Sequence, residues 1–276
     1  MLEGFVGFPP EYAAMCREKG YWEDRSLRDQ FADNIFTPFA DRIAVIDGDV
    51  SVTYAELDAI AEKLALNLWD LGLRPLDRVV VMLPNAIEFA YLYFALQKLG
   101  AIPICALATH RYHELSQFTE IAQATMCVAP DRQRDFEFAP MIARVQAESP
   151  CMTHGIILGD AGGGFLSFAD LLNRTPEAAS AVLDAIEIDP TDPAVFQLSG
   201  GTTGVPKLIP RTHNDYWLNS NLATAVTEVY PESCLLLVLP IGHNLPLACP
   251  GMQGFLIKGA RVVLSTSARP DDVFRL

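Results

Sequence analysis

The segment LSGGTTGVPKLIPRTH, residues 198–213, has the composition of a loop that binds phosphate. Its glycines permit positive φ angles and close approach of the backbone, and its hydroxyls and lysine add donors and a positive charge. Successive backbone N–H groups in such a loop can form an anion-binding nest. The candidate ATP- and phosphate-binding residues are Ser199, Gly200, Gly201, Thr202, Thr203, Gly204 and Lys207.

The spacing of this loop differs from the common nucleotide-binding motifs. A Walker A loop requires GxxxxGK[ST], but Lys207 follows Pro206 and precedes Leu208. Pro206 has no N–H to donate to a phosphate. The GxGxxG fingerprint is also absent from the sequence. From composition alone, a solvated hairpin between two strands is an equal alternative.

The elements that must position this loop alternate between strands and helices. Thr53 and Glu56 form a capping-box pattern that starts one helix, and Gly100 closes another. We expect strands at 42–47, 50–54, 77–85, 101–107, 125–130, 154–160, 194–200, 234–240 and 260–265, and helices at 86–100, 113–124, 138–149, 215–229 and 252–259. This alternation predicts an α/β fold with largely parallel sheets flanked by helices, in which ligands bind beyond the carboxyl ends of the strands.

The domain organisation is predicted from stretches that lack a clear strand or helix pattern. Residues 1–40 read as a surface-wrapping arm, and residues 161–190 read as a flexible turn followed by a linker. We therefore expect a first α/β subdomain at 1–190 and the start of a second subdomain at 191–276. The chain stops within a pattern typical of a helix start, which indicates a truncated protein.

Composition excludes several classes of protein. The net charge of −14 argues against nucleic acid as a partner, because the phosphate backbone rewards clustered Lys and Arg. The N-terminus lacks a signal-peptide pattern, and no run of about 18 apolar residues predicts a membrane span, so we expect a cytoplasmic protein. The six cysteines lack metal or disulfide spacing, which favours buried free thiols.

The remaining histidines have structural interpretations beside functional ones. His110 and His113 lie three residues apart, as a metal pair would, but no third ligand is evident and a helix start with exposed imidazoles is favoured. His213 is interpreted as a supporting partner of the site rather than a direct ligand. Tyr216 and Trp217 are expected in a helix core.

Taken together, these motifs resemble the acyl-adenylate-forming superfamily, and within it the aryl acid–AMP ligases. The resemblance rests on the loop at 198–213 with GHNLPLACPG at 242–251, supported by YWED, YAELD, DRVVVMLPN, FALQKLGAIP, THRYHEL and RVVLS. It spans nearly the whole chain but only the N-terminal portion of such an enzyme. The later motifs of the superfamily, which include an acidic magnesium ligand and a C-terminal lysine, would lie beyond Leu276.

The resemblance implies a two-step reaction in siderophore biosynthesis. An aryl acid, salicylate or 2,3-dihydroxybenzoate, reacts with ATP and Mg²⁺ to give the aryl-adenylate and pyrophosphate. The acyl group then passes to the phosphopantetheine thiol of an aryl carrier protein or of a carrier domain of a non-ribosomal peptide synthetase. Residues 1–276 alone are expected to be inactive, and no metal ligand is assigned within them. The alternatives are an acyl-CoA ligase for another carboxylate and a non-catalytic nucleotide-binding module.

By the same resemblance, the aryl-acid pocket comprises His243, Asn244, Cys249 and Gly251. His243 would lie near the reacting carboxylate as the catalytic residue, and Asn244 would bind polar groups on the ring. Gly251 would start a closely packed helix at the pocket floor. Cys249 stands where members that take 2,3-dihydroxybenzoate tend to carry serine. A thiol is a poor partner for a 3-hydroxyl, which predicts a preference for salicylate of roughly tenfold or more.

Overall fold

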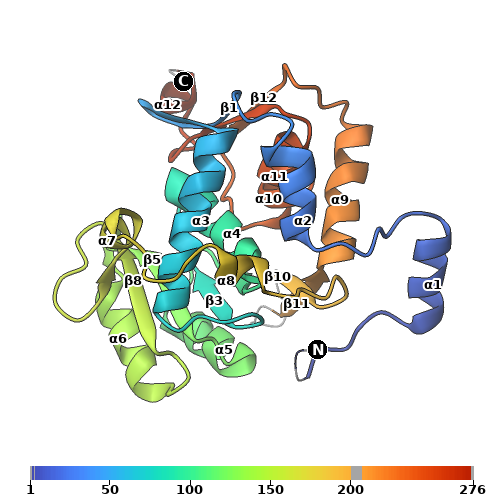
Figure 1. Ribbon diagram of the computed structural model, residues 1–276. Helices are drawn as coiled ribbons and strands as arrows, with labels where there is room; N and C mark the ends of the chain where they lie inside the picture. Colours follow the sequence, from blue (N-terminus) through green and yellow to red (C-terminus); the bar gives the residue numbers. More distant parts are fainter. Residues whose placement is uncertain (1, 3, 200–206, 275–276) are drawn as a thin grey trace.

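Buried apolar strands form two mostly parallel sheets in the computed structural model, which describes residues 2, 4–199 and 207–274 (Figure 1). The larger sheet has the order β11 (Leu208–Thr212), β10 (Pro193–Leu198), β4 (Ile102–Cys105), β3 (Arg78–Val81), β5 (Met126–Pro130), β8 (His154–Leu158) and β9 (Leu166–Ser167). The smaller has the order β12 (Cys234–Leu237), β13 (Arg261–Leu264), β1 (Ile43–Asp47) and β2 (Val50–Thr53). A separate hairpin pairs β6 (Arg132–Gln133) with β7 (Phe136–Glu137).

Helices connect and cover these strands, which confirms the predicted α/β class. They are α1 (Pro10–Glu18), α2 (Leu27–Phe31), the π-helix η1 (Ala32–Phe36), α3 (Tyr54–Asp70), α4 (Ile87–Leu99), α5 (Tyr112–Ala122), α6 (Ala139–Glu148), α7 (Phe168–Asn173), α8 (Ala181–Asp184), α9 (His213–Val226), α10 (Asn244–Ala248), α11 (Gly251–Ile257) and α12 (Pro270–Val273). The capping box at Thr53 and the left-handed C-cap at Gly100 are both present, as predicted.

The period-2 alternation of the strands divides the core between two layers. In β3, Val79 and Val81 belong to a core shared with α3 and α4, whereas Val80 faces a second core with α5 and α6. Helix α4 contacts both β4 of the larger sheet and β1 of the smaller one. The two sheets are therefore joined through a shared helical layer, visible in the centre of Figure 1.

The two sheets do not divide at the expected boundary between residues 190 and 191. Strand β10 pairs in parallel with β4, so part of the expected second subdomain completes the larger sheet. In the other direction β1 pairs in parallel with β13, which places an early hairpin in the late sheet. The chain thus crosses between the sheets twice, first from β2 to β3 and later from β11 to β12.

Three local expectations are wrong. Residues 27–36 are not a surface arm, since Leu27, Phe31 and Ile35 recur every fourth residue and are fully buried. The segment 161–190 is more than a linker, because it forms β9, α7 and α8. The apolar run CLLLVLP at 234–240 predicts a buried strand, but β12 lies at an edge of its sheet with Cys234 exposed and Leu236 38% exposed.

Candidate active site

The base of the glycine-rich loop is a closed hairpin. Strands β10 and β11 are antiparallel, and Leu198 pairs with Leu208 in their last register position. Beyond them Ser199 N donates to Lys207 O at 3.0 Å, and Lys207 N donates to Ser199 Oγ at 3.2 Å. The Lys207 side chain is exposed. The hairpin of the alternative interpretation is therefore real, and it presents the two ends of the loop side by side.

The central loop residues Gly200, Gly201, Thr202, Thr203 and Gly204 lie outside the described residues, so their predicted roles stay predictions. The strand after the loop leads into α9, whose start is well defined. The Thr212 side chain accepts from Asp215 N at 3.2 Å, which caps the helix. Helix α9 then packs against β10, α10 and α11. One helix therefore connects the loop hairpin to the second motif.

The second motif, GHNLPLACPG, forms a turn and two short helices. His243 is the exposed N-cap residue of α10, and Asn244 is its first residue. The Asn244 Oδ1 atom is buried and has no hydrogen-bond partner among the described residues. A buried acceptor without a partner costs about 1–3 kcal/mol, which makes this atom a candidate for binding a ligand hydroxyl.

Gly251 starts α11, as predicted, because no other residue fits there. Its φ is +46°, and a Cβ at this position would lie 2.2 Å from Pro246 O. The backbones of α10 and α11 therefore touch directly. Its place at a pocket floor is untested.

Cys249 lies at the end of α10 and is half-buried. The preceding carbonyl, Ala248 O, accepts from Asn219 Nδ2 at 2.9 Å and from Ser220 Oγ at 2.7 Å. Because Asn219 and Ser220 both belong to α9, this helix fixes the backbone carbonyl that precedes Cys249.

Two histidines outside the motif have clear structural roles. Burial lowers the pKa of His213 to about 3, and its Nδ1 accepts from Leu27 N at 3.1 Å. It therefore holds α2 against α9 in its neutral form. His110 lies just before α5, near the expected helix start, and its Nδ1 accepts from Leu107 N at 3.1 Å. No cluster of three metal-ligating side chains occurs in the described part of the chain.

His110 is nevertheless a neighbour of the second motif. Burial lowers the pKa of His110, Glu114 opposes this effect, and the charge of His243 lowers the pKa further. The two imidazoles therefore lie within electrostatic range of each other. The sequence interpretation placed His110 at a helix start and missed this proximity.

The carboxyl ends of four strands meet beside this motif. A cavity of about 110 Å³ is lined by residues that follow β3, β4, β12 and β13, among them Asn85, Ala106, Gly242 and Ser265. Parallel α/β sheets bind ligands at this end of their strands. Asn85 was overlooked from the sequence, although an Asn after a predicted parallel strand is a usable signal.

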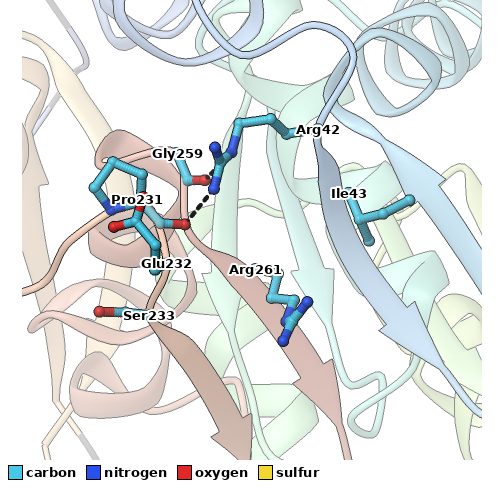
Figure 2. A pocket seen from close by; sticks show the side chains of 7 residues that line it. All are labelled: Arg42, Ile43, Pro231, Glu232, Ser233, Gly259 and Arg261. Carbon is cyan, nitrogen blue, oxygen red and sulfur yellow. Dashed lines mark hydrogen bonds between the residues drawn. The ribbon is translucent and has the colours of Figure 1, made fainter.

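A larger pocket of about 390 Å³ lies at the opposite end of the smaller sheet (Figure 2). It is lined by Ile43 and Arg261, which begin β1 and β13. Figure 2 shows Arg42 donating to the backbone oxygens of Gly259 and Pro231. Because these donors bind the backbone and the pocket lies at the amino ends of the strands, we assign it no catalytic role.

The chain combines an α/β fold of two sheets with a loop hairpin and a polar motif near the carboxyl ends of the strands. The chain belongs to the AMP-binding enzyme family, whose profile matches residues 33–276. The structural likeness extends to an apo structure of Mycobacterium smegmatis MbtA, with a TM-score of 0.89 and 39% identity over 99% of this chain and 50% of that one.

Two curated relatives are similar along the whole chain. A salicyl-AMP ligase / salicyl-S-ArCP synthetase of Mycobacterium tuberculosis is 40% identical over 99% of this chain and 48% of its own length. A 2,3-dihydroxybenzoate-AMP ligase of Bacillus subtilis is 40% identical over 100% of this chain and 50% of its own. The chain spans about half the length of both. No helix in the described ranges is long and apolar enough to cross a membrane.

Proposed function

We propose that the full-length protein carrying this chain activates an aryl acid with ATP and transfers it to a carrier-protein thiol. A carboxylate oxygen of the acid attacks the α-phosphorus of ATP, the bond to the β-phosphate breaks, and pyrophosphate leaves. The thiol of phosphopantetheine then attacks the acyl carbon, its proton is lost, and AMP leaves. Transfer to a carrier protein is supported by the mycobacterial relative, a salicyl-AMP ligase / salicyl-S-ArCP synthetase, and siderophore assembly is the pathway in which we place this reaction.

The observation that carries the aryl-acid proposal is the buried, unpartnered Oδ1 of Asn244. A hydroxyl at the 2-position of a benzoate ring would donate to it and remove the cost of a buried acceptor without a partner. Fatty acids have no such donor. Both the salicylate and the 2,3-dihydroxybenzoate relatives act on acids that have a 2-hydroxyl.

The phosphate end of the site is proposed at the loop hairpin. Lys207 is exposed beside Ser199, so its ammonium group is available to the charge that develops on the leaving pyrophosphate. The loop residues between them supply further donors in this proposal. Mg²⁺ would neutralise phosphate charge, but the described residues hold no cluster of carboxylates that could bind it.

Salicylate is the proposed preferred acid, because Cys249 is a poor partner for a 3-hydroxyl. A buried hydroxyl that loses water without a good replacement costs about 1–3 kcal/mol. Salicylate has no 3-hydroxyl and avoids this cost, while Asn244 still serves its 2-hydroxyl.

The test is exchange of labelled pyrophosphate into ATP by the full-length protein. We expect exchange with salicylate and 2,3-dihydroxybenzoate, and none with fatty acids or amino acids. Asn244→Ala should weaken the stimulation of exchange by salicylate. The control is Asn221→Ala, because the Asn221 side chain donates to Trp217 O within α9; this variant should keep the stimulation. Exchange stimulated only by fatty or amino acids would refute the aryl-acid proposal, and absence of any exchange would favour a non-catalytic module.

The acceptor is tested separately from the acid. Loading of a holo carrier protein is expected to exceed loading of free coenzyme A at equal thiol concentration. The reverse result would favour an aryl-CoA ligase.

A further inference from the structure

Asn85 lies where the carboxyl ends of the two sheets converge. It follows β3 and is 5% exposed. Its Nδ2 donates to Leu239 O and Ser265 O at 3.0 Å and to Leu237 O at 3.2 Å. Its Oδ1 accepts from Ile241 N at 2.8 Å. One side chain of the larger sheet thereby holds the strand ends of the smaller sheet.

The segment held by Asn85 leads directly into the aryl-acid motif. The backbone at Gly242 packs closely against the end of β4, because a Cβ on Gly242 would lie 2.9 Å from Ala106 O. The turn then closes as His243 N donates to Pro240 O at 3.0 Å. The turn at Gly242 is therefore fixed between Asn85 and the end of β4, one residue before the candidate site begins at His243.

Only an amide of this length fits the chemistry at residue 85. The group must donate to carbonyl oxygens and accept an N–H at the same time, which Asn does with its two terminal atoms. An aspartate has the same shape but presents a negative oxygen to these carbonyls. A serine keeps a donor and an acceptor but cannot span the same set of partners.

We propose that Asn85 is a positioning residue for the aryl-acid end of the site. By fixing the turn that precedes His243 and Asn244, it sets where the amide of Asn244 meets the ring hydroxyl. This inference rests on the proposed function. A residue that only joins the sheets would change the amount of folded enzyme, whereas a positioning residue changes the selectivity of each folded molecule.

The experiment measures kcat/KM for salicylate and for benzoate in the full-length protein. Their ratio is independent of the fraction of active enzyme. For the wild type we expect salicylate to be favoured about tenfold or more, the value of one buried hydrogen bond. In Asn85→Asp and in the milder Asn85→Ser, the ratio should fall to about twofold or less, while the KM for ATP changes less than about threefold.

Asn67 provides the matched control. It is fully buried in α3, and its Nδ2 donates to Leu171 O at 2.8 Å and to Arg174 O at 3.1 Å, far along the chain from the motif. Asn67→Ser should lower stability and leave the ratio unchanged.

The outcomes separate the two proposals. A wild type without preference for salicylate overturns the proposed aryl-acid site and this inference with it. A selective wild type with an unchanged ratio in both Asn85 variants overturns this inference alone. Variants that do not fold at all assign Asn85 to joining the sheets and also overturn it.

Discussion

Replacing Cys249 with serine tests the specificity of the proposed site at a single atom. The position is suited to this change because the preceding carbonyl, Ala248 O, is held by both Asn219 and Ser220. The backbone at residue 249 therefore has little freedom to move when sulfur becomes oxygen. A change in substrate preference would then report the chemistry of the side chain.

The expected magnitude follows from the burial of residue 249. A fully enclosed 3-hydroxyl facing a thiol would cost up to about 3 kcal/mol. Cys249 is only half-buried, so the lower part of the range applies, about 1.4 kcal/mol or tenfold in kcat/KM. Cys249→Ser should therefore raise the ratio of 2,3-dihydroxybenzoate to salicylate about tenfold, mainly by improving the former.

The assay is kcat/KM for adenylate formation with both acids, in the wild type and the variant of the full-length protein. Cys234→Ser is the control, since Cys234 is exposed on the edge strand β12 and should not affect the ratio. An unchanged ratio in Cys249→Ser would remove residue 249 from the specificity argument. A fall in the ratio of 2,3-dihydroxybenzoate to salicylate would show that the serine hydroxyl does not hydrogen-bond the 3-hydroxyl, which would contradict the prediction.

Three further predictions concern the loop, pH and packing. Alanine at Thr202 and Thr203 should slow adenylate formation on the order of 10²-fold and leave aryl-acid affinity nearly unchanged; a main effect on affinity would misplace the loop. Burial lowers the pKa of His213 to about 3, against about 6.5 when unfolded, so only the unfolded chain takes up this proton between those values. Stability should fall as the pH drops from about 6.5 toward 3, and His213→Asn should remove up to about 1.4 kcal/mol per pH unit of that slope in urea unfolding; equal slopes would contradict this. Gly251→Ala should cost about 2 kcal/mol or more in unfolding free energy, while Gly163→Ala, which meets no atom within 4 Å, should cost less than about 0.5.

Much of the fold was predictable because the central strands of the larger sheet are short buried runs with clear boundaries. The run around Val80 and the helix closed by Gly100 lie where local sequence alone places them. Helices α2 and η1 were missed because their apolar residues are separated by charged and polar ones, so that the spacing of Leu27, Phe31 and Ile35 is easily overlooked. Strand pairing between β1 and β13 is a long-range property that no local pattern contains.

The candidate site was predictable where a motif carries it and not where the fold assembles it. His243, Asn244 and Gly251 stand in one short stretch and were assigned together. Asn85 acts through partners more than a hundred residues away in sequence, so its role becomes visible only when the two sheets are placed. The proximity of His110 to His243 was hidden for the same reason.

The pairing of β1 with β13 also has a consequence for how the chain folds during synthesis. Every strand of the larger sheet has been synthesised once Thr212 is added to the chain. Strand β1 is made early, but its parallel partner β13 does not exist until residues near Val262 are added. Until then the hairpin β1–β2 exposes an unpaired edge on the nascent chain. Such late closure by distant strands is slow and open to aggregation, so chaperone dependence during translation should concentrate in the interval between these two points.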